Sequence, residues 1–445
     1  MRSTIIACII LFVGTVANAQ SYSLEEAIAF ALKHNEQLKQ ADLDVEISEA
    51  KVKETTAIGL PQISGEATAN YFIDIPVQVA PPFDLGIPGI PAPDPNDLQE
   101  FQFGLPYSAT AGINASQLLF DGSYFVGLKA SKAYLNYAML AKEKSEIEVR
   151  NMVAQTYFAA ASLGKTYTTL LENKKTLQQS VSETQSMYEV GFMEKQDFDQ
   201  VRLSLANLEY QAQVVLRRRE QMEQLLRLQM GLPYDQAITL TDDFDALMET
   251  IGRETIDPAF NLENHIDYRT VTQGEELSKL SLSAERTKNM PQLAAFFTHS
   301  QNGFSQEFNE LFENEFYPTT IVGLQLNVPI FSSGMRYFKT KQAKLELEKT
   351  QSQKRMLSQN LKTQALTAKQ NFNSALENLK IAEDNLDLAE TIKQTTEVKY
   401  KEGLASSLDF AQAESQYLQT LTAYISTSQE LFNAKLELDK ALGKY

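Results

Sequence analysis

A motif that recurs at a fixed spacing constrains this chain more than any other feature. The motif is Tyr-x-x-Gly followed by Asp-Phe, and its two copies are Tyr188, Gly191, Asp197 and Phe198, and Tyr400, Gly403, Asp409 and Phe410. The two glycines are 403 − 191 = 212 residues apart, and the same spacing separates Gly122 from Gly334. A long spacing kept without a gap indicates a duplicated domain rather than a solenoid of short repeats. The chain is therefore expected to consist of two similar halves.

Residues 1–19 have the pattern of a secretory signal peptide. Arg2 precedes an apolar run over residues 5–16, and Ala-Asn-Ala at residues 17–19 is the small-x-small pattern that signal peptidase cleaves. A membrane helix is the alternative, but about twelve apolar residues fall short of the roughly twenty that cross a bilayer. We expect Gln20 to be the first mature residue, and no lipid anchor, because no cysteine follows the cut.

Composition narrows the class of protein. The 57 acidic and 40 basic residues give a formal charge of −17, which argues against nucleic acid as a partner. The single cysteine, Cys8, lies in the signal segment, so the mature chain has to be stable without disulfides. Outside the signal segment no apolar run is long enough for a membrane helix, whereas the strands of a membrane β-barrel alternate and escape such a search.

Four segments change from helical periodicity to strict alternation of apolar and polar residues. Two follow Pro61, over residues 63–73 and 107–115, and two follow Pro291, over residues 295–299 and 322–330. The clearest of them have the length and texture of a tilted transmembrane strand with one face to lipid and one to water. We predict two β-hairpins, over residues 61–120 and 291–331.

The segment between the first two strands is rich in proline. Residues 75–106 hold eight prolines, too many for a helix or a central strand. We predict a long exposed loop of the first hairpin, because the alternation resumes on both sides; a disordered linker is the alternative. Aromatic residues beside the strand ends fit a membrane interface or ordinary loop packing, and they are Phe101, Phe103, Tyr107, Phe316 and Tyr317.

Very long helices follow each hairpin. Residues 123–189 and 335–402 contain no proline, and each stretch corresponds to about 100 Å of helix. Each is predicted to turn back as a coiled-coil hairpin, over 121–230 and 332–445. Shorter helices are predicted at 20–60, with a break near Asn35, and at 259–290. Residues 231–258 are predicted to form a solvated, acidic linker.

The number of strands requires more than one chain. Four strands cannot close a barrel, since the smallest single-chain membrane barrels use about eight. An open sheet edge in lipid would leave unpaired backbone groups that cost several kcal/mol each. Two copies would give a filled barrel of eight strands, and three copies would give twelve.

These residues resemble the TolC family of outer-membrane efflux proteins over nearly the whole mature chain. The motifs that carry the resemblance are Leu60-Pro61-Gln62-Ile63-Ser64 with Met290-Pro291-Gln292-Leu293, Leu119-Phe120-Asp121-Gly122 with Ile330-Phe331-Ser332-Ser333-Gly334, and the paired Tyr-x-x-Gly turns. The resemblance implies a mixed α and β membrane protein: a homotrimer with a twelve-stranded β-barrel in the outer membrane of a Gram-negative bacterium, continuous with a periplasmic α-helical coiled-coil barrel. It also implies that the shorter helices are periplasmic and that the acidic linker is equatorial.

The resemblance also implies a function and partners. Such a protein is the exit duct for drugs, other small molecules or polypeptides in a tripartite efflux or type I secretion system. Its partners would be a periplasmic adaptor and an inner-membrane pump of the resistance-nodulation-division, ABC or major facilitator type. It would be neither an enzyme nor a cofactor-binding protein. The alternative is a soluble periplasmic coiled-coil scaffold or adaptor in which the four alternating segments form a small domain.

The repeated motif marks the predicted site. In the TolC family the Tyr-x-x-Gly turns lie at the periplasmic tips, which implies that Tyr188, Gly191, Tyr400 and Gly403 lie where an adaptor docks. The two glycines also suit ordinary helix C-caps, because glycine accepts positive φ at low cost. The two readings are compatible.

The acidic residues of the motif are predicted to belong to a gate. Asp197 and Asp409 match acidic positions near the family's tip, where copies around an axis form a ring that attracts cations. Stabilisation of the return helices through the helix dipole is the alternative. The best-known family pattern has arginine at Ala405 and a second aspartate at Gln412, so closure here is expected to rest on Tyr400, Asp409 and apolar contacts.

No other chemistry has a candidate site in the sequence. The three histidines include His34 and His265, which suit turns near helix breaks better than metal ligation. The sequence contains no nucleophile elbow, phosphate-binding loop or metal-ligand pattern that would support an enzyme. We therefore predict no catalytic residue, metal or cofactor.

Overall fold

The computed structural model describes residues 20–82, 94, 96–102, 104–252 and 260–444. The predicted signal peptide, Phe103, the central part of the proline-rich segment and the end of the acidic linker lie outside these residues. The chain divides into two compact units. One comprises Met1–Glu46, Tyr137–Gln273 and Gln351–Tyr445, and the other Ile47–Asn136 and Gly274–Thr350.

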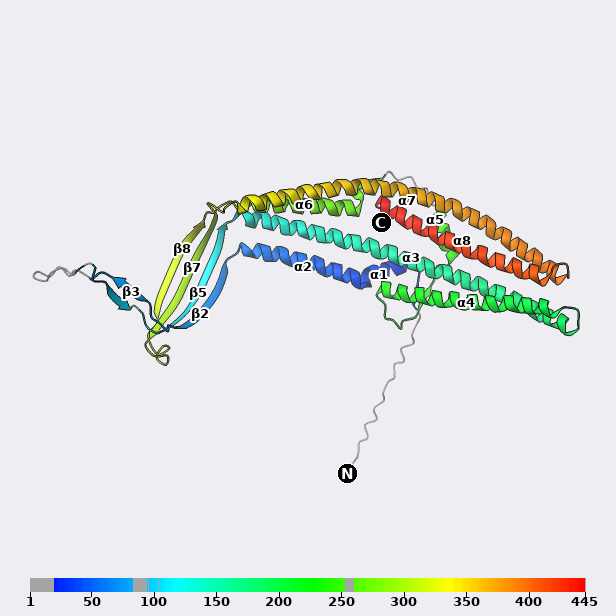
Figure 1. The fold of residues 1–445 in the computed structure, drawn as a ribbon, viewed down its shortest axis with the longest axis horizontal. Coiled ribbons are helices and arrows are strands. Elements are labelled where there is room, and N and C mark those ends of the chain that lie inside the picture. The colour runs from blue at the N-terminus through cyan, green and yellow to red at the C-terminus, as the bar shows by residue number, and fades with distance from the viewer. Residues whose placement is uncertain (1–19, 83–93, 95, 103, 253–259, 445) are drawn as a thin grey trace, which may run out of the picture. The chain divides into compact units, whose positions relative to one another are not determined.

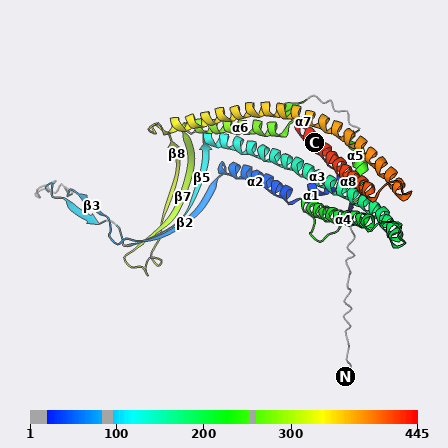
Figure 2. The ribbon, with the colours of Figure 1, turned by 45° about the vertical axis from the view of Figure 1, so that its right-hand side comes forward.

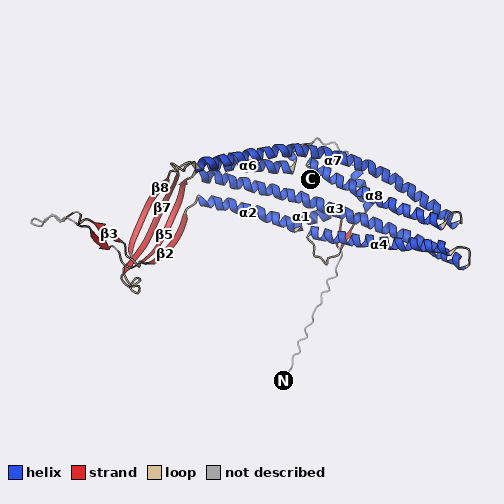
Figure 3. Cartoon of the chain, in the orientation of Figure 1, coloured by secondary structure: helices blue, strands red, loops and turns tan. Residues whose placement is uncertain are grey.

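Long helices dominate the first of these units (Figure 3). The helices of the chain are α1 (Leu24–His34), α2 (Glu36–Ile58), α3 (Gly122–Glu189), α4 (Lys195–Met230), α5 (Phe244–Gly252), α6 (Ile266–Thr287), α7 (Met335–Lys401) and α8 (Ser407–Leu442), with a 3-10 helix at Leu262–Asn264. Both predicted helical hairpins are present, since α3 turns back as α4 and α7 turns back as α8 (Figure 1). Within the described residues, no helix combines the length and apolar character needed to cross a membrane.

Local signals in the sequence explain where these helices begin and end. Ser23 and Glu26 form the capping box expected for α1. Asn35 interrupts the helix, and its side-chain oxygen accepts from the first backbone N–H groups of α2. Gly231 and Gly443 end α4 and α8 with positive φ angles of 74° and 70°. The two return helices thus start and stop at the spacing of the sequence repeat.

The core of the helical unit is aromatic and spans both halves of the chain. The ring of Phe158 on α3 stacks on Phe432 of α8 at a centroid distance of 4.2 Å, and Phe244 of α5 lies 5.6 Å away. Other large side chains fully buried in this core include Tyr157, Leu226, Met230, Leu431 and Leu438. Each large aromatic pair adds stabilisation beyond the area it buries. The stack of Phe158 on Phe432 therefore helps to hold the two hairpins together.

The prediction of a solvated linker over residues 231–258 does not hold for the described part, residues 231–252, and the rest lies outside the described residues. The segment contains strand β6 (Ile238–Leu240), which pairs in parallel with β1 (Gln20–Tyr22), and helix α5, whose apolar face is buried in the core. Tyr157 fixes the pairing by donating a hydrogen bond to the Tyr22 carbonyl at 2.9 Å. A helix of 9 residues and a strand of 3 residues are shorter than the window of about 11–18 residues over which periodicity is read.

The second unit contains one antiparallel sheet of four strands in the order β2-β5-β7-β8. The strands are β2 (Gln62–Tyr71), β5 (Tyr107–Phe120), β7 (Gln292–Ser305) and β8 (Tyr317–Asn327). All four predicted strands are present, although β7 is much longer than expected and β8 ends at Asn327 instead of continuing to residue 330. Pro329 has no N–H to give to a ladder, which accounts for the early end.

Register divides the sheet into an apolar face and a polar face. Residues paired across the four strands share a face, and one such row is Ile63, Ala115, Phe297 and Val322. A row on the opposite face is Glu66, Gly112, Ser300 and Thr319. Ile63 and Val322, at the two edges, are 74% and 77% exposed. The alternation seen in the sequence therefore corresponds to two chemically distinct faces.

The proline-rich segment is not entirely a loop. Its flanks form a second, short antiparallel pair, β3 (Val77–Ala80) with β4 (Gln99–Gln102). Valines at alternate positions explain β3, because β-branched residues favour strands. Among the aromatic residues noted in the sequence, Tyr107 stacks on Tyr71 at 4.8 Å, and Phe316 lies against Gly303. The side chains of Phe101 and Phe103 lie outside the described set.

The two helix-ending glycines provide a matched test of this packing. A Cβ at Gly231 would lie 2.2 Å from the carbonyl oxygen of His34, whereas at Gly443 the nearest atom would be 3.5 Å away. Both alanine variants meet the cost of a left-handed backbone, about 1–2 kcal/mol, but only Gly231→Ala also forces a clash. We expect Gly231→Ala to lower the thermal unfolding midpoint, followed by circular dichroism in detergent, clearly more than Gly443→Ala. Equal losses would contradict this packing.

Candidate functional site at the ends of the helical hairpins

Both helical hairpins reverse through the same glycine turn. Gly191 has a φ of 82°, its N–H donates to the Tyr188 carbonyl at 3.0 Å, and the N–H of Phe192 donates to the Met187 carbonyl at 2.9 Å. These two bonds define a Schellman motif. Gly403, with a φ of 73°, repeats both bonds in the second hairpin. The interpretation of the glycines as helix caps is therefore confirmed.

The space around these two turns is open. A Cβ added at Gly191 or at Gly403 would meet no atom within 4 Å in the described chain. Glycine is thus required by the backbone angle alone. Both glycines are exposed, and Figures 1 and 2 show the turns at the ends of the hairpins.

An aromatic stack closes each hairpin behind its turn. Tyr188 stacks on Phe198 at a centroid distance of 5.8 Å, and Tyr400 stacks on Phe410 at 5.0 Å. The surroundings of the two stacks differ. Tyr188 is exposed, whereas Phe410 is 0% exposed. The copies of the motif therefore share a turn but not an environment.

Phe410 anchors the second hairpin in the first. It belongs to an apolar cluster whose other buried members come from α3 and α4: Leu170, Leu177, Val201, Leu208 and Ala212. The Tyr400 hydroxyl forms a hydrogen bond of 2.8 Å with the Thr184 hydroxyl of α3. Burial raises the pKa of Tyr400, and its hydrogen bond to Thr184 opposes this rise. The two hairpin ends are thus joined by an apolar plug and a polar contact.

The two aspartates of the motif have different partners. Asp197 accepts a hydrogen bond from the buried hydroxyl of Ser407 on α8, so it links the two return helices. The N-cap of its own helix, Glu194, makes no side-chain capping bond. Asp409 instead forms a capping box with Ser406 at the start of α8 and stays exposed. Both aspartates lie in the first turn of their return helices, as the helix-dipole alternative requires, and Asp409 also caps its helix through its side chain.

Titration of Asp409 follows from this geometry. Hydrogen bonds from Ser406 lower the pKa of the Asp409 carboxyl below its ordinary value. A group with a depressed folded-state pKa stabilises the fold above its unfolded pKa and loses this contribution as pH falls through the folded value. The cap of α8 is therefore intact at neutral pH and weakens only in acid.

Of the predicted site residues, Asp197 and Tyr400 both make contacts between the hairpins near the start of α8. Tyr188 is exposed instead. Thr184 and Ser407 were not identified from the sequence. A signal existed for Ser407, because the repeat spacing places Lys195 at the equivalent position and so marks a difference between the halves. Ala405 is half-buried in the turn, and Gln412 is exposed on α8.

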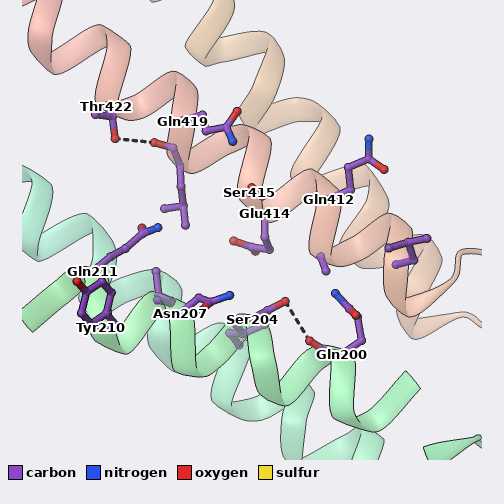
Figure 4. Close-up of a pocket in the computed structure, with 15 residues that line it drawn as sticks. Gln200, Ser204, Asn207, Tyr210, Gln211, Gln412, Glu414, Ser415, Gln419 and Thr422 are labelled. Atoms are coloured by element: carbon purple, nitrogen blue, oxygen red, sulfur yellow. Dashed lines mark hydrogen bonds between the residues drawn. The ribbon is translucent and has the colours of Figure 1, made fainter. Parts of the chain in front are cut away.

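A polar groove of about 750 Å³ runs between α4 and α8 behind the turns (Figure 4). Amide and hydroxyl side chains line it from both helices, among them Gln200, Ser204, Asn207, Gln211, Gln412, Ser415 and Gln419. Glu414 extends from α8 toward α4 in this groove. Side chains of this kind can bind polar groups of a partner or of water, but they contain no nucleophile with an activating base.

The family model described as "Outer membrane efflux protein" matches residues 82–232 and 262–444. The chain belongs to the outer membrane efflux protein family. The predicted resemblance to TolC-like channels is thereby confirmed, and the outer membrane is the location of the protein.

Two curated relatives and one solved structure illustrate the relationship. The probable efflux pump outer membrane protein TtgC of Pseudomonas putida is 23% identical over 95% of this chain and 83% of its own length. The alkaline protease secretion protein AprF of Pseudomonas aeruginosa is 23% identical over 76% of this chain and 67% of its own. The fold matches the solved structure of CusC with a TM-score of 0.73 at 18% identity, over 94% of this chain and 91% of that one.

The two phenylalanines of the motif allow the anchor to be tested. Phe410→Ala removes a fully buried ring and is expected to cost about 3–5 kcal/mol of stability. Phe198→Ala removes a partly exposed ring and is expected to cost much less. Urea unfolding of both variants in detergent measures the difference. A larger loss for Phe198→Ala would show that the anchor is in the other hairpin.

Proposed function

We propose that the protein is the outer-membrane exit channel of a tripartite efflux or type I secretion system. It would act as a homotrimer and conduct its cargo passively from an inner-membrane pump to the outside. Each chain would contribute four strands to a twelve-stranded barrel and two helical hairpins to a periplasmic tunnel. Membership of the outer membrane efflux protein family supports this proposal.

The observation that carries the proposal is the four-stranded sheet. Its edges are β2 and β8, and its apolar row ends in the exposed side chains of Ile63 and Val322. Backbone groups at an edge cost several kcal/mol each if they face lipid without partners. Pairing of β8 in one copy with β2 in the next would satisfy both edges. Three copies would close the sheet, with its apolar face toward lipid.

The polar face of the sheet suits the interior of such a barrel. Its row through Glu66 and Ser300 carries small and polar side chains. In a membrane barrel, residues alternate between lipid and an aqueous interior. A water-filled passage would therefore be lined by this face.

Exposed apolar residues on the long helices support assembly as well. Ile381, Leu388 and Ile392 of α7 are large apolar residues at the surface of a single chain, and they line one groove. Contiguous apolar surface on a soluble helix usually marks a contact with a partner. Packing of six hairpins side by side in a trimer would cover it.

The printed names of the relatives suggest the range of cargo. TtgC is named as an efflux pump protein and AprF as a protease secretion protein. We therefore propose small molecules or a polypeptide as cargo. The implied partners are a periplasmic adaptor and an inner-membrane pump of the resistance-nodulation-division, ABC or major facilitator type.

We propose that the hairpin ends form the gate and the adaptor-docking region. Tyr188, Gly191 and Gly403 are exposed there and would contact the adaptor, while Tyr400 and Asp197 take part in links between the hairpins of one chain. Asp409, exposed at the start of α8, would form the acidic ring in a trimer. The hydrogen bond of Asp197 to Ser407 would take over part of the role that the family gives to the arginine absent at Ala405.

Fractionation and bilayer recording test the channel itself. We expect the mature protein in the detergent-extracted outer membrane as a trimer, and stepwise conductance when it is added to planar bilayers. Recovery in the aqueous periplasmic fraction without detergent would instead support the alternative of a soluble scaffold or adaptor. A trimer in the membrane without conductance would contradict the passive channel.

The two aspartates are expected to affect the gate differently. Asp197→Ala removes the link to Ser407 and should raise single-channel conductance, because the return helices can then separate. Asp409→Ala removes an exposed charge and should mainly reduce block by divalent cations. Current recordings on both variants under the same salt conditions separate the two effects. Unchanged conductance of Asp197→Ala would remove this residue from the gate.

A further inference from the structure

A charged cluster is buried between the two hairpins, away from the motif. The Lys393 ammonium of α7 lies 3.4 Å from a carboxylate oxygen of Glu414 on α8, and the two side chains are 9% and 5% exposed. The same ammonium donates a hydrogen bond of 2.5 Å to the Asn173 side chain of α3 and lies 4.6 Å from the ring centre of Tyr417. We call Asn173, Lys393 and Glu414 the Lys393 cluster. It joins both hairpins of the chain.

The cluster occupies positions where a coiled coil normally has apolar residues. On α3, Asn173 lies in the buried series that contains Leu170 and Leu177. On α7, Lys393 follows the buried Ala389. At seam positions apolar residues stabilise most, and a polar residue there lowers stability while it fixes register. The Lys393 cluster therefore weakens the packing of α7 and α8 against α3.

Its hydrogen bonds are incomplete. In the described chain the Nδ2 of Asn173 and the Oε1 of Glu414 are buried without a hydrogen-bond partner. Burial raises the pKa of Glu414, and the charge of Lys393 opposes this rise. A partly satisfied buried network is less stabilising than apolar packing of the same volume. Separation of the helices would return these groups to water and recover part of the cost.

The cluster belongs to one half of the repeat only. At the repeat spacing, Val181 stands in place of Lys393 and Arg202 in place of Glu414. Arg202 is exposed, with its side chain over the Phe198 ring. The first hairpin thus has no equivalent buried pair at these positions, which makes the cluster a property of the second hairpin and its contact with α3.

We propose that the Lys393 cluster is a reversible latch, which keeps the second hairpin against α3 in the closed tunnel and lets the two separate at low cost. The inference rests on the proposed channel function. Lys393 precedes the turn at Gly403 by ten residues, about 15 Å of helix. The latch is therefore a second contact between the hairpins, farther from the turns than the hydrogen bond of Asp197 to Ser407.

The latch makes two substitutions act in opposite directions. Glu414→Gln leaves the Lys393 ammonium buried without a counter-charge, so the hairpins should separate. The triple variant Asn173→Leu, Lys393→Met and Glu414→Met replaces the cluster by apolar groups and should hold the hairpins closed. Opposite effects on stability would also follow from a merely structural ion pair, so the deciding readouts are the separation of the hairpins and the conductance.

Cysteine labelling measures the separation directly. Ser180 is 1% exposed on α3, and one turn later the Thr184 hydroxyl bonds to Tyr400 of α7, so this part of α3 faces the second hairpin. Cys8 lies in the segment expected to be cleaved. In the assembled full-length protein, we expect Glu414→Gln to speed maleimide labelling of a Ser180→Cys variant by about a hundredfold, as for a broken buried ion pair. The triple variant should slow it. Arg202→Met in the first hairpin is the matched control and should leave the rate unchanged.

Conductance provides the second readout. Glu414→Gln should raise single-channel conductance and the triple variant should lower it, with both still extracted as trimers. Unchanged labelling in Glu414→Gln, or faster labelling in the triple variant, would overturn the latch. If the unmodified protein gave no conductance, the proposed channel function would fail, while the labelling rates would still decide whether the cluster holds the hairpins together.

Discussion

The hydrogen bonds missing at two sheet edges determine the rest of the architecture that we propose. The sheet has β2 and β8 at its edges, and it exposes an apolar row across all four strands. In lipid such edges have to be paired. Once three chains share one barrel, each chain must also place its helices around the same axis. The duplicated hairpins supply alternating helices that can do this.

The two hairpins have the same turn and different anchors. Both turns need glycine for the same backbone reason, and the return helices have equal lengths. The second copy, however, buries Phe410 among residues of the first hairpin, and it uses Ser406 and Asp409 to cap its own helix. In the first copy the equivalent aspartate makes no capping bond of this kind and instead accepts a hydrogen bond from Ser407. The two helix starts therefore differ in what their aspartates contact.

Periodicity predicted the elements, because it records which face of each segment is buried. The alternation around Val322 and the recurrence of buried residues every three or four positions along α8 both depend on local spacing, and both are present in the structure. Contacts between segments that are far apart in the chain produce no periodic pattern in the sequence. Thr184 and Tyr400 are 216 residues apart, and only the docking of the hairpins brings them together.

Short elements were missed for a related reason. β6 and α5 are stabilised by burial against β1 and the aromatic core rather than by their own propensity. The assignment of Asp409 as a cap could be anticipated, since Ser406 stands three residues before it. The contact of Asp197 with Ser407 could not, because it depends on how two helix starts meet.

The pairing of β1 with β6 gives the chain a fixed order of assembly. β1 begins at the residue expected to become the new N-terminus, yet its partner strand lies 238 − 20 = 218 residues later. The carbonyl of Tyr22 also accepts the hydrogen bond of Tyr157. If the chain is exported from the N-terminus, as the predicted signal peptide implies, β1 would emerge first and stay unpaired until its partner strand, 218 residues later, has followed. Such a delay leaves an exposed strand edge that is open to capture by other chains.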